Sequence, residues 1–75
     1  MTSQERLEVA ARLEEAVLRI PGIPNNAEEM FERYETTAIS VLDSEHANYG
    51  EGVLCGFLSD YLTVKRQELG LEPSP

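Results

Sequence analysis

Cysteine and histidine are almost missing from this sequence, and their scarcity excludes the usual ways of reinforcing a small protein. The chain has 75 residues, with one cysteine, Cys55, and one histidine, His46. A lone cysteine cannot form a disulfide within the chain, and one histidine leaves no Cys/His set for structural zinc. Because so short a chain buries only a small core, we expect self-association or a partner protein to support it.

Basic residues are also few. Six Lys and Arg stand against 14 Asp and Glu, which gives a net charge of -8. We therefore expect no direct nucleic-acid binding, since affinity for phosphates comes mainly from clustered Lys and Arg. Between residues 21 and 50 the only basic residue is Arg33, and the acidic residues there are Glu28, Glu29, Glu32, Glu35, Asp43 and Glu45. A negative surface of this kind solubilises a protein or steers a basic partner towards it.

Long apolar runs are absent as well. No stretch approaches the roughly 18 apolar residues that a membrane span needs, and the chain does not start with a signal-peptide pattern. We expect a cytoplasmic protein that does not enter a membrane, and the free thiol suits a reducing compartment. The sequence also has no glycine-rich phosphate loop and singles out no Ser-His-Asp set, so we do not expect an enzyme.

What the sequence does contain is helical periodicity. Thr2 and Glu5 have the spacing of a capping box, which predicts a first helix over residues 3–19. Pro21 stops it, because proline has no N–H and forces the preceding residue into an extended conformation. The apolar arc of this helix is broad and is interrupted only by Glu14, so we expect it to contact two neighbours.

A second helix is predicted over residues 26–44. Asn26 and Glu29 repeat the capping-box spacing. Its apolar stripe consists of Met30, Phe31, Tyr34, Ala38, Val41 and Leu42. Glu28, Glu32 and Glu35 line a lateral face, and Ile39 falls among them.

A third helix is predicted over residues 49–69, with Asn48 and Glu51 as its capping box. Its apolar residues are Val53, Leu54, Phe57, Leu58, Tyr61, Leu62, Val64 and Leu69. Gly70 is the expected C′ residue, and residues 71–75 are expected to form a flexible tail. No stretch alternates as a strand would.

The sequence therefore predicts an all-α protein in which residues 1–70 form one helical domain. The three helices form either a small three-helix bundle or an interdigitated helical homodimer. A homodimer is expected because a monomer of this size has difficulty covering two broad apolar arcs.

Two small groups of residues could bind a metal or act as a nucleophile, and a structural role is favoured for both. Asp43, Glu45 and His46 could bind a divalent metal, but a polar helix end explains them as well. Cys55 could be a nucleophile if His46 approached it, but on a helix it lies beside Leu58, which favours a small buried filler. We assign no catalytic residue, no metal ligand and no cofactor.

A row of small side chains marks the third helix, namely Gly52, Gly56, Ser59 and Thr63. Small residues let two helices approach closely, whereas glycines near a helix start also reflect fraying. Both interpretations stay open.

The leading hypothesis is a non-enzymatic interaction protein, an adaptor or inhibitor that presents a helical apolar face rimmed by acids to a larger protein. Such interfaces concentrate their energy in a few aromatic and aliphatic anchors. The expected partner-binding residues are Ile39, Tyr49, Phe57 and Tyr61, with Glu28, Glu32 and Glu35 at the rim.

Two other functions are considered. In one, the acids imitate the phosphates of a nucleic acid and occupy the basic groove of an enzyme, as small phage-type anti-defence proteins do; this is an analogy of size and charge. The mimicking residues would be Glu28, Glu32, Glu35, Asp43 and Glu45. In the other, the chain is a small subunit that completes a larger active site.

Overall fold

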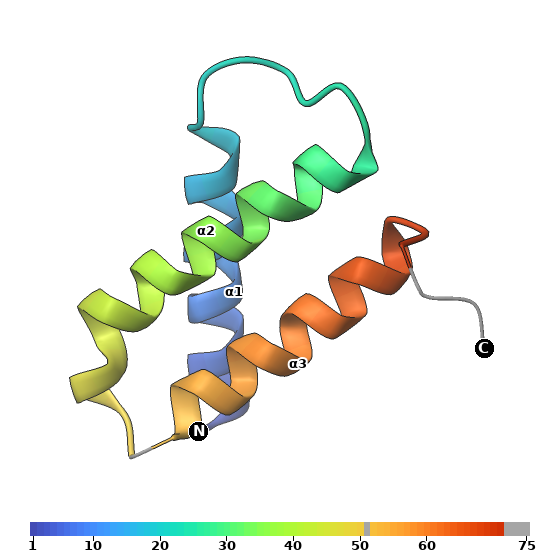
Figure 1. Ribbon diagram of the computed structural model, residues 1–75. Helices are drawn as coiled ribbons and strands as arrows, with labels where there is room; N and C mark the ends of the chain where they lie inside the picture. The colour runs from blue at the N-terminus through green and yellow to red at the C-terminus, as the bar shows by residue number, and fades with distance from the viewer. Residues whose placement is uncertain (51, 72–75) are drawn as a thin grey trace.

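The computed structural model describes residues 1–50 and 52–71, and these residues contain helices and connections but no β-strand (Figure 1). The elements are α1 (Ser3–Leu18), α2 (Ala27–Glu45), a short 3₁₀ turn (His46–Asn48) and α3 (Val53–Glu68). The predicted all-α class with three helices is confirmed.

The start of α1 is fixed by the expected capping box. The backbone N–H of Thr2 donates to Glu5 Oε1 over 2.8 Å, and the N–H of Glu5 donates to Thr2 Oγ1 over 3.1 Å. The helix ends at Leu18, shortly before Pro21, as the proline predicts.

The start of α2 uses a cap that differs from the expected box at one position. Asn26 Oδ1 accepts a hydrogen bond from the N–H of Glu29 over 2.9 Å, as predicted. The Glu29 carboxylate, however, accepts from the N–H of Asn25 over 2.6 Å, one residue before the cap. The preceding loop is held by Arg33, whose Nη1 donates to the carbonyl of Gly22 over 3.0 Å.

The third helix begins at Val53, four residues later than expected. Tyr49 has an extended backbone, with φ -130° and ψ 167°. Gly52 has a φ of 74°, in the left-handed region that a right-handed helix cannot pass through and that favours glycine. Of the expected cap, Asn48 lies in the 3₁₀ turn and Glu51 lies outside the described residues.

The end of α3 is the predicted glycine cap. Gly70 has a φ of 75°, its N–H donates to Gln67 over 3.0 Å, and the N–H of Leu71 donates to Arg66 over 2.9 Å. These two bonds form a Schellman motif and satisfy carbonyls at the helix end. Apart from Leu71, the tail expected at 71–75 lies outside the described residues.

The helices form two layers. α2 and α3 lie antiparallel in one layer, and α1 crosses behind them (Figure 1), which gives a plate of 35 × 34 × 19 Å. α2 is the central element, because it packs against both α1 and α3. The core between the layers consists of Val9, Leu13, Val17, Tyr34, Ala38, Val41, Leu54 and Leu58.

Part of the broad apolar arc of α1 stays uncovered. Leu7 and Leu18 are 71% and 78% exposed, because α1 turns Val9, Leu13 and Val17 towards the other helices. None of the helices in residues 1–50 and 52–71 has the length and apolar content needed to cross a membrane.

Candidate functional site

α2 and α3 form a groove on the face of their layer that is turned away from α1. Each helix lines it with four residues at relative positions 0, 3, 4 and 7, so that one side of each helix faces the hollow. The lining residues are Glu35, Ala38, Ile39 and Leu42 from α2, and Cys55, Leu58, Ser59 and Leu62 from α3. We call this hollow of about 220 Å³ the outer groove.

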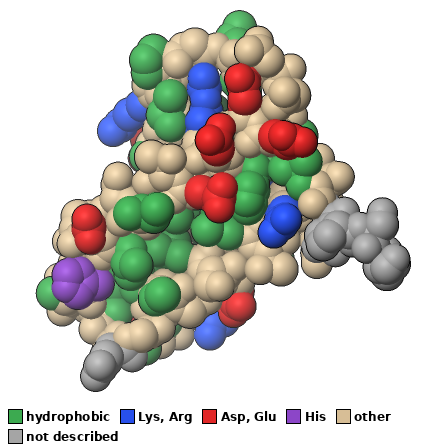
Figure 2. All heavy atoms as spheres, viewed as in Figure 1, with side chains coloured by type: hydrophobic (Ala, Val, Ile, Leu, Met, Phe, Trp, Pro, Cys, Tyr) green, Lys and Arg blue, Asp and Glu red, His purple; other side chains and the backbone are tan. Residues whose placement is uncertain are grey.

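The outer groove is apolar inside and accessible from solvent. Ala38 and Leu58 are buried at its floor, and Leu42 and Leu62 are half-buried. Ile39 is 64% exposed, and it joins these apolar side chains instead of standing alone. Figure 2 shows the resulting apolar patch on this face of the molecule. The two-layer arrangement explains the exposure, since α1 covers only the opposite side of α2 and α3.

Acidic side chains extend the outer groove along α2. Glu35 also lines a second hollow of about 480 Å³, together with Glu28, Glu32 and Phe31. The guanidinium of Arg66 lies 5.8 Å from the centre of the Phe31 ring in this hollow. Red carboxylates accordingly border the green patch in Figure 2. The three glutamates that the sequence places on one lateral face therefore do lie together, and Glu35 also shares the outer groove with Ile39.

A second constellation, centred on Glu14, ties the three helices together. Tyr34 from α2 donates its hydroxyl to Glu14 Oε2 over 2.8 Å, and Tyr61 from α3 donates to Glu14 Oε1 over 2.6 Å. Lys65 Nζ lies 3.3 Å from Oε1 and is placed over both rings, 5.0 Å from the centre of Tyr34 and 5.6 Å from that of Tyr61. We call these four residues the Glu14 cluster.

The Glu14 cluster stabilises the ordinary charge state of each member. Burial raises the pKa of Glu14, but the hydrogen bonds from Tyr61, Tyr34 and Lys65 outweigh it, so the pKa lies below its usual value. Burial and the bond to Glu14 raise the pKa of both tyrosines. Burial lowers the pKa of Lys65, but the contact with Glu14 outweighs it and the pKa is raised. At neutral pH the cluster therefore holds a carboxylate, two phenols and an ammonium.

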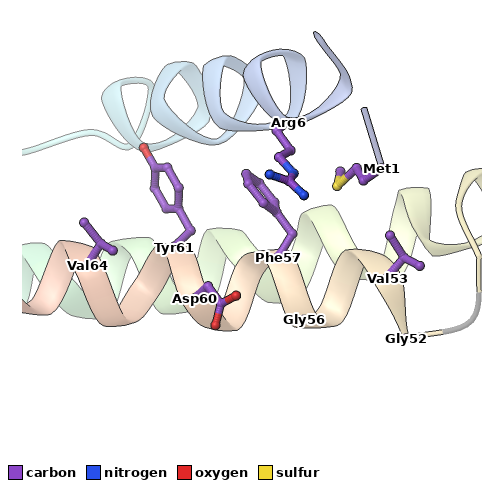
Figure 3. A pocket seen from close by; sticks show the side chains of 9 residues that line it. All are labelled: Met1, Arg6, Gly52, Val53, Gly56, Phe57, Asp60, Tyr61 and Val64. Atoms are coloured by element: carbon purple, nitrogen blue, oxygen red, sulfur yellow. The ribbon is translucent and has the colours of Figure 1, made fainter. Parts of the chain in front are cut away.

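The four expected anchors do not share one surface. Ile39 lines the outer groove, whereas the ring of Phe57 lies 6.0 Å from that of Tyr61 on the side of α3 that faces α1 (Figure 3). Tyr61 is engaged by Glu14 through its hydroxyl. Tyr49 is half-buried against the core and accepts a hydrogen bond from Arg12 over 3.3 Å.

The candidate metal ligands are not brought together. Glu45 forms an ion pair of 2.8 Å with Arg12, and His46 Nδ1 hydrogen-bonds the carbonyl of Leu42 over 3.1 Å. In the part of the chain that the structure describes, no three His, Cys, Asp or Glu side chains form a metal-binding group.

The expectation that Cys55 is a buried filler is wrong. The residue is exposed and lines the outer groove. The reason is that Cys55 lies on the side of α3 that α1 does not cover.

Sequence reasoning missed Glu14, Tyr34 and Lys65 as interacting residues. One signal was present, because Glu14 was the single interruption of the apolar arc in its helix. An acid at such a position needs a hydrogen-bond or ion-pair partner. The sequence pattern does not indicate that the partners are tyrosines of the other two helices.

Comparisons of the chain with protein-family models, with curated proteins and with solved structures gave no significant match.

Proposed function

We propose that this chain is a non-enzymatic adaptor or inhibitor that binds a larger protein through the outer groove. The observation that supports this most is an exposed apolar hollow between two helices, with Glu35 in one wall and two more glutamates in the adjoining hollow. Both walls are formed by residues at relative positions 0, 3, 4 and 7, and most of them are apolar, with Glu35 and Ser59 as the polar members. Such a lining suits a helix that lies in the groove between the walls.

The charge of the groove indicates the chemistry of the partner. Glu35 lines the outer groove, Glu28 and Glu32 line the adjoining hollow that Glu35 shares, and the whole chain carries a net charge of -8. A complementary segment has apolar residues on one side of a helix and Lys or Arg beside them. Its basic residues would speed association and set its direction, while its apolar residues would supply the affinity.

The Glu14 cluster supports a non-enzymatic role. A general acid or base works best with a pKa near the working pH, and catalytic sites shift pKa values towards it. Here the pKa of Glu14 moves down, and those of Tyr34, Tyr61 and Lys65 move up, away from neutrality. These directions are those of a structural network.

A peptide titration tests the groove. The probe is a synthetic amphipathic helix with leucines on one side and lysines beside them, and a scrambled peptide of the same composition is its control. We expect only the ordered peptide to shift backbone amide NMR signals, and to shift those around Ile39 and Leu62. Ile39→Ser should raise the Kd about tenfold or more, because it removes a central apolar anchor.

Ile23→Ser is the matched control, since Ile23 is also exposed, at 89%, and does not line the outer groove. Its Kd should equal that of the unmodified protein. Equal losses in the two variants, or signal shifts spread over all helices, would show that the peptide binds without using the groove.

Nucleic-acid mimicry is a second candidate, favoured by the exposure of Glu28, Glu32, Glu35 and Asp43 along α2. Glu45, the fifth residue expected to imitate a phosphate, does not offer a free charge, because it forms an ion pair with Arg12. Mimicry predicts that Glu32→Gln with Glu35→Gln abolishes binding to a basic partner and that salt weakens binding steeply. Docking in the outer groove predicts sensitivity at Ile39 and a small effect of salt.

We also propose that the protein forms a homodimer and is cytoplasmic. Exposed apolar side chains on α1 and α3, such as Leu7 and Val64, support self-association. The exposed thiol of Cys55 suits a reducing compartment.

A further inference from the structure

A second groove runs between the first turns of α1 and the length of α3 (Figure 3). It has a volume of about 620 Å³ and lies on a different side of α3 from the outer groove. The lining residues that matter here are Arg6 from α1 and Val53, Gly56, Phe57, Asp60 and Val64 from α3. We call it the lateral groove.

Gly56 has no explanation within the described chain. It lies in the first half of α3, where glycine weakens a helix relative to alanine. A Cβ added there would meet nothing within 4 Å, and its φ is not positive, so neither packing nor backbone conformation requires a glycine. A glycine on an open helix surface does allow another backbone to come close.

Apolar side chains flank Gly56 on the same side of α3. Val53 and Val64 are 36% and 53% exposed, and Phe57 is half-buried between them. Residues 53, 56, 57, 60 and 64 follow one another at helical intervals, so they form a continuous stripe. A helix that crosses α3 at Gly56 would cover both valines.

The charges of the lateral groove are self-complementary. Arg6 stands on one wall and Asp60 on the other, and within residues 1–50 and 52–71 neither side chain forms an ion pair. This matters because a molecule with a net charge of -8 generally repels a second copy of itself. A basic residue in the groove offers a place where a second copy is attracted.

We infer that two copies of this chain associate through the lateral groove, with α3 crossing α3 in antiparallel fashion at Gly56. A two-fold axis there makes the interface isologous. Asp60 lies about 6 Å along the helix from Gly56, so the partner's Asp60 comes to the Gly52 side of the axis. Figure 3 shows Arg6 above Phe57, level with Gly56, and Met1 farther towards Gly52. Each Asp60 then lies within reach of the partner's Arg6.

This inference rests on the homodimer proposed above, supplies its interface, and leaves the outer groove free for another protein. The two surfaces can therefore be tested separately. Ile39→Ser should weaken peptide binding without changing the solution mass, and the variants below should change the mass without moving the peptide site.

Sedimentation equilibrium of the full chain over a wide concentration range is the test. We expect a dimer whose Kd rises tenfold or more in Gly56→Leu, because the new side chain fills the crossing point. Gly56→Ala should raise the melting temperature of the dilute protein and yet weaken the dimer. This combination separates an interface glycine from one that is merely tolerated, which would raise the melting temperature alone.

Charge reversal tests the pairing. Arg6→Asp and Asp60→Arg should each weaken the dimer, and the double variant should restore it to within about threefold. Arg19→Asp, which changes the net charge by the same amount as Arg6→Asp and lies outside the groove, should weaken it far less. A monomer at all concentrations, a dimer unaffected by Gly56→Leu, or reversal without recovery would overturn the inference.

Discussion

Glu14 is the side chain that most directly connects the three helices. Its two carboxylate oxygens accept hydrogen bonds from tyrosines of α2 and α3. The Lys65 ammonium contacts the same carboxylate and lies over both tyrosine rings. Within the described residues, no buried side-chain nitrogen or oxygen lacks a hydrogen-bond partner. The acid that interrupts the apolar arc of α1 therefore does not destabilise the core, because other helices supply its donors.

Glu14→Gln should show this role through pH. Because the folded pKa of Glu14 lies below its ordinary value of 4.5, its contribution is present above pH 4.5 and is lost as the pH falls through the folded pKa. We expect the variant to lose about 1 kcal/mol of unfolding free energy at neutral pH. The difference from the unmodified protein should shrink on acidification, as urea denaturation at a series of pH values would show.

Glu15→Gln is the control for this experiment, since Glu15 is exposed and, among the described residues, pairs only with Arg19, over 3.6 Å. Its effect should be small at every pH. A Glu14→Gln deficit that stays constant from neutral to acidic pH would mean that the charge of the carboxylate contributes nothing.

The neighbours of a residue could be predicted from the sequence where they lie close to it along the chain. Ile39 could be expected near acids because Glu35 lies one helical turn away. Tyr61 could not be assigned to Glu14, because 47 residues separate them and only the crossing of α1 over the other helices brings them together. A tyrosine on an apolar stripe has the same pattern whether its hydroxyl binds a partner protein or an internal carboxylate.

The helices themselves follow from short-range signals. Capping residues and glycines set most of their ends, which is why α1 and α2 begin within one residue of the predicted positions. The predicted start of α3 was wrong by four residues, because Asn48 lies in the 3₁₀ turn and the left-handed backbone of Gly52 sets the boundary. A backbone dihedral angle of this kind leaves no periodic trace in the sequence.

The cap of α2 gives a test of such signals. Asn26→Ala removes the side chain that accepts the N–H of Glu29, and we expect it to lower the free energy of unfolding by about 1 kcal/mol. Asn25→Ala keeps the backbone N–H that donates to Glu29 and should cost much less. Thermal denaturation followed by circular dichroism would compare them, and equal costs would contradict the assigned cap.

The molecule as a whole is a thin plate with an excess of negative charge. Six Lys and Arg cannot neutralise 14 Asp and Glu, and Glu28, Glu32 and Glu35 lie near one another on α2. Such like charges destabilise the folded state by repulsion, which salt screens.

We therefore expect added NaCl to stabilise the protein. Raising the salt to about 1 M, where the Debye length is about 3 Å, should raise the melting temperature by about 4 °C or more. Changing Glu28, Glu32 and Glu35 to glutamine should reduce this dependence. A melting temperature that falls with salt would instead mean that the ion pairs of Glu14 and Arg12 outweigh the repulsion.

Which faces of the plate remain open could not be predicted. The sequence shows that α1 and α3 are apolar over wide arcs, but the direction in which α1 crosses the other helices decides which part of each arc is covered. That crossing buries Val9 and Leu13 and leaves Leu7 and Leu18 in solvent. It also places Ile39 and Phe57, which were both expected to be partner-binding anchors, on different surfaces.

Cys55 lies exposed in the wall of the outer groove and is the only cysteine of the chain. The reactivity of this thiol can therefore report whether the groove is covered. A segment that binds against Ile39 and Leu62 is expected to shield the Cys55 sulfur from a small alkylating reagent, because all three residues line the outer groove. The rate at which iodoacetamide modifies the unaltered protein is therefore a direct measure of how often the groove is occupied.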